Sequence, residues 1–136
     1  MTDTSLAPTS WSNAVNRVGI NAEISDPWTK RFNLFGQYIY GNDTNSDASN
    51  GALRMDGGFV GLNVMLVPEE FYAFGRYDFM KVKQTDETQH QIDVGLRYHV
   101  LKNVIITGGY TSTKQTVPNM VDHTVSTFTL GTLFGF

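Results

Sequence analysis

The sequence predicts an all-β protein in which about seven strands pair antiparallel. From residue 17 to 24, and again from 91 to 100, apolar and polar residues alternate strictly, which is typical of a strand with two different faces. No stretch sustains the spacing of three and four residues that marks an amphipathic helix. The chain has no cysteine, so disulfides, thiolate metal sites and cysteine nucleophiles are excluded.

Taken in order, the alternating segments lie at 14–25, 31–41, 52–66, 70–83, 89–101, 104–113 and 123–136. Most have about ten residues or more, close to the roughly 9–11 that cross a membrane and longer than the roughly 5–6 usual in soluble sheets. Residues 1–13 show no alternation and are expected to form an N-terminal tail or loop. The domain organisation is therefore this tail, followed by strands over 14–136.

The connections between these segments alternate in character. Those at 25–30, 67–69 and 101–103 are short or moderately short, whereas those at 42–51, 83–88 and 112–122 are longer and polar. Short turns at one end and long loops at the other are the layout of transmembrane β-barrels.

One face of nearly every predicted strand is apolar, and the other carries glycine, threonine, amides and isolated charges. Periodicity alone also fits a soluble barrel with an apolar interior. Strand length, the scarcity of Lys and Glu on the polar face, and aromatic residues near strand ends favour lipid outside. These aromatic residues are Phe32, Tyr38, Tyr40, Phe71, Tyr77, Phe79, Tyr98, Tyr110 and Phe136.

Six charged residues are expected to face the lumen of such a barrel. They could tune the passage of ions or solutes, or form cross-strand ion pairs that rigidify a narrow lumen, and the sequence leaves both open. Three are basic and three acidic, which argues against strong ion selectivity. They are Arg17, Glu23, Arg76, Asp78, Asp93 and Arg97.

The last strand resembles the C-terminal assembly signal of Gram-negative outer-membrane proteins, in which a polar residue, a glycine and two alternating hydrophobic residues close the chain. Thr129, Gly131, Phe134 and Phe136 match these places. Segments 33–38 and 74–79 are similar to strands of porin-like barrels, and the resemblance covers about residues 14–136. It implies insertion by the outer-membrane barrel assembly machinery, with the short turns in the periplasm.

The odd strand number departs from that family, whose barrels have an even number. Either residues 1–13 hide an eighth strand, or the chain is the C-terminal part of a larger or multi-chain barrel. Pro8 and the missing alternation favour the second explanation, as does the start from Met1 to Trp11, which lacks a signal peptide. An upstream segment or another chain would then complete the barrel, and the isolated chain should not close as a monomer.

Other candidate sites are weak. Asp43 to Asp47 resembles the start of a calcium loop, but Ala48 and Arg54 stand where an EF-hand needs glycine and an acid. The histidines, His90, His99 and His123, lie on different strands or opposite faces. The nearest catalytic set, His90 with Asp86 and Ser112, has no supporting spacing. We therefore expect no enzymatic activity, cofactor or metal.

Together these features predict a porin-like protein of the outer membrane that lets small hydrophilic solutes or ions pass. The alternatives are a structural barrel that anchors or sheathes a partner complex, and a soluble ligand-binding barrel. Partners would be outer-membrane lipid and the assembly machinery; a net charge of −3 and a pI near 5.5 argue against nucleic acid. In a wide lumen, Gly95→Ser should be tolerated.

Overall fold

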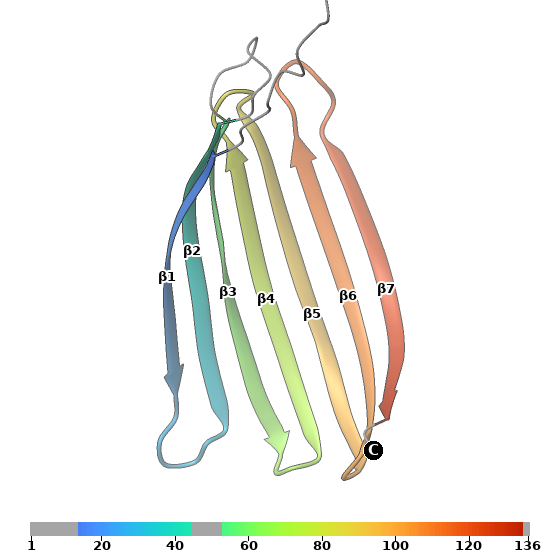
Figure 1. The fold of residues 1–136 in the computed structure, drawn as a ribbon. Coiled ribbons are helices and arrows are strands. Elements are labelled where there is room, and N and C mark those ends of the chain that lie inside the picture. Colours follow the sequence, from blue (N-terminus) through green and yellow to red (C-terminus); the bar gives the residue numbers. More distant parts are fainter. Residues whose placement is uncertain (1–13, 45–52, 135–136) are drawn as a thin grey trace, which may run out of the picture.

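A computed structural model of the chain describes residues 14–44 and 53–134, which form one antiparallel sheet (Figure 1). Each strand pairs with the next in sequence, so the order in space is the order in the chain. The strands are β1 (Ala14–Ser25), β2 (Phe32–Thr44), β3 (Leu53–Val67), β4 (Phe71–Val82), β5 (Glu87–Leu101), β6 (Val104–Thr116) and β7 (His123–Phe134). The predicted class, strand number and antiparallel pairing are confirmed. The tail at 1–13 lies outside the described residues.

The strands reach further into all three polar connections than the sequence predicts, and β2 continues to Thr44. β6 continues to Thr116, because Lys114 and Gln115 pair with Thr124 and His123 of β7. Strand pairing uses backbone groups, so a polar segment extends a hairpin as readily as an apolar one. The connections expected at 83–88 and 112–122 are consequently only 83–86 and 117–122.

The sheet has no hydrophobic core of its own. Among the described residues only Asp26, Gly41, Gly61 and Val82 are buried. A sheet that is apolar on one face normally buries that face against a second layer, and the described residues supply no such layer. The stability of the apolar side must therefore come from something outside these strands.

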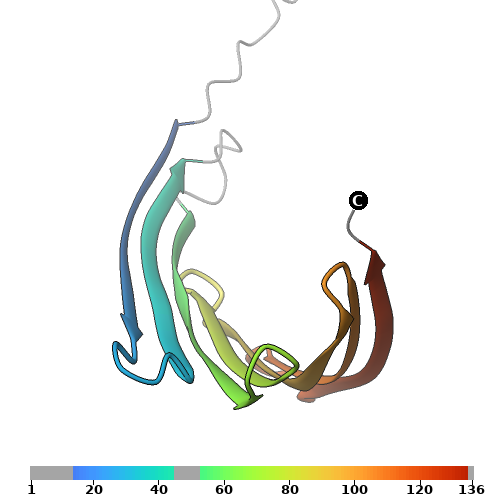
Figure 2. The same cartoon turned by 90° about the horizontal axis from the view of Figure 1, so that it is seen from below.

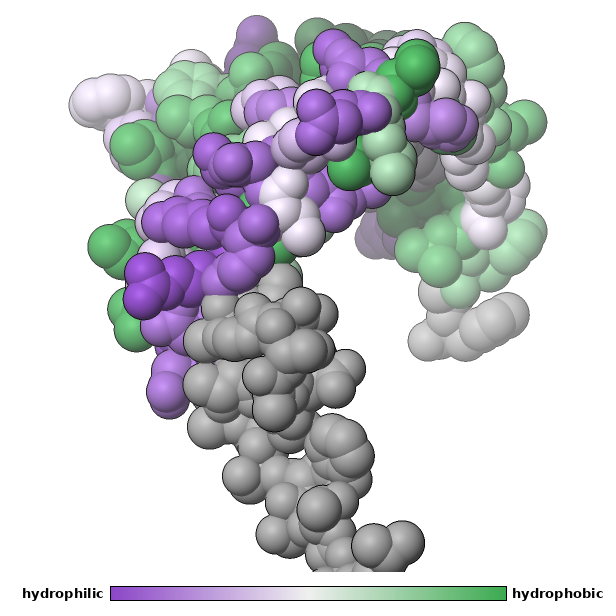
Figure 3. Space-filling view, turned by 90° about the horizontal axis from the view of Figure 1, so that it is seen from above, coloured by the Kyte–Doolittle hydropathy of each residue, from purple (hydrophilic) through white to green (hydrophobic). Residues whose placement is uncertain are grey.

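Curvature gives the sheet two different sides. Seen from below, the strands follow an open arc (Figure 2). We call the side that carries Arg17, Gln37, Arg76 and Gln91 the inner face, and the side of their strand neighbours the outer face. Hydrophobic residues, in green, lie along the outer margins of the arc in Figure 3.

The sheet is open in the described residues. β1 and β7 are its two edges, and neither is paired with the other. A closed barrel is therefore not seen, and that part of the prediction stays a prediction. No helix among the described residues is long and apolar enough to cross a membrane.

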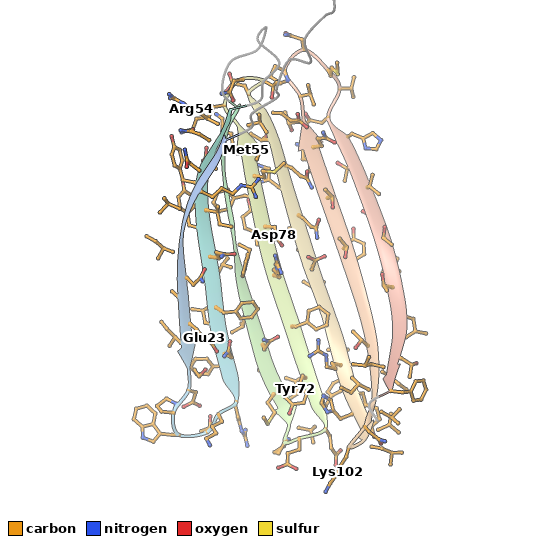
Figure 4. All side chains as sticks on the ribbon, in the orientation of Figure 1. Glu23, Arg54, Met55, Tyr72, Asp78 and Lys102 are labelled. Atoms are coloured by element: carbon orange, nitrogen blue, oxygen red, sulfur yellow. The ribbon has the colours of Figure 1, made fainter. Side chains whose placement is uncertain are left out.

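Tight turns join the strands at both ends of the sheet. Lys30, Glu69, Asp86 and Asn119 each adopt a positive φ there, as tight turns often require. At the first turn the Asp26 carboxylate accepts hydrogen bonds from the Thr29 hydroxyl and from the backbone N–H of Trp28, at 3.0 Å for the latter. Figure 4 shows Lys102 at the same end as this turn and Arg54 at the opposite end.

Candidate functional site

The six charged residues predicted to face a lumen share the inner face. Strand register aligns Glu23, Phe35, Gly61, Arg76 and Asp93 in one row across β1 to β5. The other three lie an even number of residues from these on their own strands, which keeps them on the same side. They are Arg17, Asp78 and Arg97. Whether this face lines a lumen stays a prediction.

Arg76 and Asp78 form a forked ion pair along β4. The Arg76 Nη2 lies 2.6 Å from Asp78 Oδ1, and Nε lies 2.9–3.0 Å from both carboxylate oxygens. The guanidinium carbon is 4.0 Å from the ring centroid of Phe59 on β3. Each charge is thus neutralised and held in place within the sheet. Of the six charged residues, these two form the one ion pair found in the described part of the chain, and it runs along a strand, not across strands.

The other two acidic residues, Asp93 and Glu23, accept hydrogen bonds from neutral partners. Asp93 accepts hydrogen bonds from the Thr111 hydroxyl at 2.6 Å and from the Gln91 amide at 2.9 Å. Glu23 accepts one from the Asn33 amide at 2.6 Å. These bonds fix the carboxylates against the wall of the inner face without cancelling their charge.

The inner face is hollowed over five strands. A depression of about 590 Å³ extends from Arg17 on β1 to Asp93 on β5. Its inner-face lining includes three glutamines, Gln37, Gln89 and Gln91. A second hollow of about 480 Å³ continues towards β7 past Arg97 and Thr107. The two hollows share Arg76 and Asp93 in their linings, so they form one trough on the concave side of the sheet.

Sequence reasoning missed three phenylalanines in this trough, Phe35, Phe59 and Phe74. A Cβ built on Gly61 would lie 2.5 Å from the Phe35 ring, and one on Gly95 would lie 2.4 Å from the Phe74 ring. The rings of Phe35 and Phe74 therefore each cover a glycine of the neighbouring strand. In the sequence, each phenylalanine could have been noticed because it stands at a polar-face position. The glycine that it covers can be identified only from the register of the paired strands.

The expected tolerance of Gly95→Ser is wrong for the same reason. Besides the Phe74 ring, the added Cβ would lie 2.5 Å from the carbonyl oxygen of Gly108. Backbone atoms of a paired strand do not move aside cheaply, so even a small side chain strains this position.

The weaker candidates are separated. Among the described residues, His90 lies on the outer face with Nδ1 2.7 Å from the Tyr77 hydroxyl, whereas Asp86 pairs with Lys81. Ser112 contacts Ser126 at 3.4 Å. The described residues contain no group of three or more His, Asp or Glu side chains that could hold a metal ion. Most of the possible calcium loop lies outside them.

The residues of the possible assembly signal divide between the faces. Thr129 and Gly131 follow the inner-face rows of β6, and Phe134 pairs with Val104 on the outer face. Phe136 lies outside the described residues. The role of this motif stays a prediction.

The candidate site is thus the inner face of a single curved sheet, which carries the charged and amide side chains, whereas the outer face is apolar. No protein-family model, no curated protein and no solved structure matches the chain. The function therefore has to be inferred from the two faces of the sheet.

Proposed function

We propose that the seven strands form part of the wall of a porin-like β-barrel in a Gram-negative outer membrane. In this proposal the outer face contacts lipid, and the inner face borders a passage for small hydrophilic solutes or ions. The observation that carries the proposal is the direction of curvature: the polar face is concave and the apolar face is convex.

This arrangement is inverted relative to a water-soluble barrel, which encloses its apolar face. In β5 the outer-face residues Ile92 and Leu96 are 50% and 47% exposed, whereas Gln91 and Asp93 on the inner face are more covered. An apolar surface extending over seven strands is far larger than the patches that soluble monomers leave in water. The inversion supports contact with hydrocarbon and weighs against the soluble alternative.

The outer apolar residues also form an oblique band. In β1 they begin at Val18 and end at Ile24, and in β7 they begin at Phe128. Strand register places Ile24 and Phe128 in one row. The band therefore shifts by six residues over six steps between neighbouring strands, or one residue for each step.

This shift corresponds to a definite strand tilt. One residue rises about 3.3 Å along a strand and neighbouring strands lie about 4.8 Å apart, so the band crosses the strands at about 35° from their perpendicular. If the band is level with a membrane, the strands tilt by the same angle. Strands of outer-membrane barrels tilt by about 35–45°, and the agreement supports the proposal.

The height of the band fits as well. In β5 the outward apolar positions run from Ile92 to Val100. Eight residue steps span about 26 Å along the strand, or about 22 Å of height at a tilt of about 35°. The apolar belt of outer-membrane barrels is about 25 Å tall.

A structural barrel that anchors or sheathes a partner complex is the second candidate. The observation that favours it is the anchoring of the inner side chains, because Arg76 is held by Asp78 and Phe59 and the phenylalanine rings lie in the trough. A barrel whose trough is filled by side chains or occupied by a partner would have the same fixed inner side chains, but it would conduct no ions.

Neighbouring residues of β6 provide the test. Thr107 lies on the inner face in the row of Arg97, and Ile106 lies on the outer face. In planar bilayers, Thr107→Cys should change conductance after a charged, water-soluble methanethiosulfonate is added, because the added charge would stand in the passage. Ile106→Cys is the matched control and should not respond.

Three results separate the candidates. A response confined to Thr107→Cys would support a conducting lumen. Absence of conductance in an inserted, folded protein would favour the structural role. A protein that stays folded and monodisperse without lipid or detergent would refute membrane insertion.

A further inference from the structure

The two edges of the sheet run in the same direction, and this fixes what can close it. Every neighbouring pair is antiparallel, and β1 and β7 are separated by five strands. β1 and β7 therefore both run from the end that holds Arg54 to the end that holds Lys102 (Figures 1 and 4). A direct β1–β7 seam would have to be parallel.

Both edges carry unpaired backbone groups along their whole length. β1 and β7 have 12 residues each, and about half of the residues of an antiparallel edge strand point their N–H and C=O groups away from the sheet. Each such group left unpaired in hydrocarbon costs several kcal/mol. Edges of this length therefore need a partner in a membrane.

The outer-face side chains of both edge strands are more exposed than those in the middle of the sheet. On the outer face Val18 of β1 is 71% exposed and Phe128 of β7 is 83% exposed, against 45% for Val94 within the sheet. The apolar band thus reaches both edges undiminished and would continue onto whatever strands pair there.

We infer that the partner of these edges is an odd number of amphipathic β-strands from a polypeptide segment different in sequence from β1–β7. Every pair within the sheet is antiparallel, and strands that extend this pattern at both edges must begin and end with a strand opposed to β1 and β7, which makes their number odd. To continue the band, the apolar stretch of each added strand must be displaced by about one residue from that of its neighbour, as in the present sheet.

A second copy of the chain does not meet this requirement. Copies inserted in the same orientation, as the proposed membrane location demands, would join β7 of one to β1 of the other in parallel. An inverted copy would join like edges antiparallel, but would place its loops on the opposite side of the membrane. The inference rests on the proposed function both here and in the cost of unpaired edges, because each step assumes a membrane.

Hydrogen exchange on the unaltered full chain, isolated in mild detergent from the cells that make it, is the first part of the test. Every second amide of β1 and β7 on the open side should be protected as strongly as amides of β4. Rapid exchange at these amides would show free edges and overturn the inference.

Cysteine oxidation is the second part, and the chain has no native cysteine to interfere. The probes are Ile20→Cys, Leu130→Cys and the double variant, which lie at similar heights in the band. No disulfide should form in any of them. The matched positive control is Val94→Cys with Tyr110→Cys, which are paired positions on β5 and β6.

Each other outcome overturns the inference in its own way. A disulfide within one double-variant chain would mean that β1 and β7 close directly. A crosslink between two double-variant chains, absent in the single variants, would mean a ring of parallel seams. Crosslinked single variants would mean inverted dimers. None of these readouts is the one that tests conduction, so the two proposals can fail separately.

Discussion

An arginine at Ala22 should destabilise the protein far more than an arginine at Ser126, although the two positions lie in one row of the sheet. The row runs from Ala22 through Gly36, Val60, Tyr77, Ile92 and Ser112 to Ser126. Both residues are small, outward-facing and on edge strands, so the two substitutions are closely matched.

The difference follows from the oblique band. Ala22 lies one residue from the middle of the apolar stretch of β1, or about 3 Å from the midplane of a membrane at a strand tilt of about 35°. Ser126 lies two residues beyond Phe128, where the stretch of β7 begins, and so about 13 Å from the midplane. Arginine costs about 2–4 kcal/mol at the midplane and about 0–1 kcal/mol near the interface.

Equilibrium unfolding of the lipid-inserted protein in denaturant would measure both free energies. Ala22→Leu and Ser126→Leu serve as controls and should change stability little. Equal costs for the two arginines in lipid would mean that the apolar band follows the rows, and that the strands do not tilt as the oblique band requires. If neither arginine costs more than about 0.5 kcal/mol, as at an ordinary water-exposed site, the outer face does not contact hydrocarbon.

Three further predictions concern a glycine, a turn and the orientation. Gly95→Ala should destabilise the protein by about 1–3 kcal/mol by overpacking, as measured by the same unfolding assay. Gly75→Ala is the control and should be nearly neutral, because its Cβ would meet nothing closer than 3.9 Å. Equal effects would contradict the close approach of Gly95 to the Phe74 ring and the Gly108 carbonyl oxygen. Hydrogen bonds from the Thr29 hydroxyl and the Trp28 backbone lower the pKa of Asp26 from its usual 3.8. The ionised carboxylate therefore stabilises the folded state above pH 3.8, and this stabilisation is lost as the pH falls through the lower pKa of the folded state. The unfolding midpoints of wild type and Asp26→Asn should differ at pH 7 and converge at acid pH, and a difference that stays constant with pH would refute this role. Protease added to whole cells should cleave beside Val121, which is 92% exposed, and should reach the turn at Trp28 only after the outer membrane is permeabilised; cleavage first at Trp28 would reverse the topology.

The strands and their faces could be predicted from the sequence because both depend on local alternation. Arg17 and Arg97 stand at inner-face positions simply because residues two apart on a strand share a side. The ends of β6 could not be predicted, since Lys114 and Gln115 join the ladder through backbone pairing with β7 and not through any apolar pattern.

The sequence by itself determined an all-β chain with one apolar and one polar face, because apolar and polar residues alternate along each strand. Only the tertiary structure decided which face is concave, which glycines lie beneath Phe35 and Phe74, and that β1 and β7 are unpaired with each other in the part of the chain that the structure describes. These features depend on the register and curvature that arise when strands distant in sequence pair, and a single strand carries no record of either. The oblique path of the apolar band from Val18 to Phe134 is the clearest case, because each strand specifies only its own apolar stretch and the register sets how far that stretch is displaced from its neighbour's.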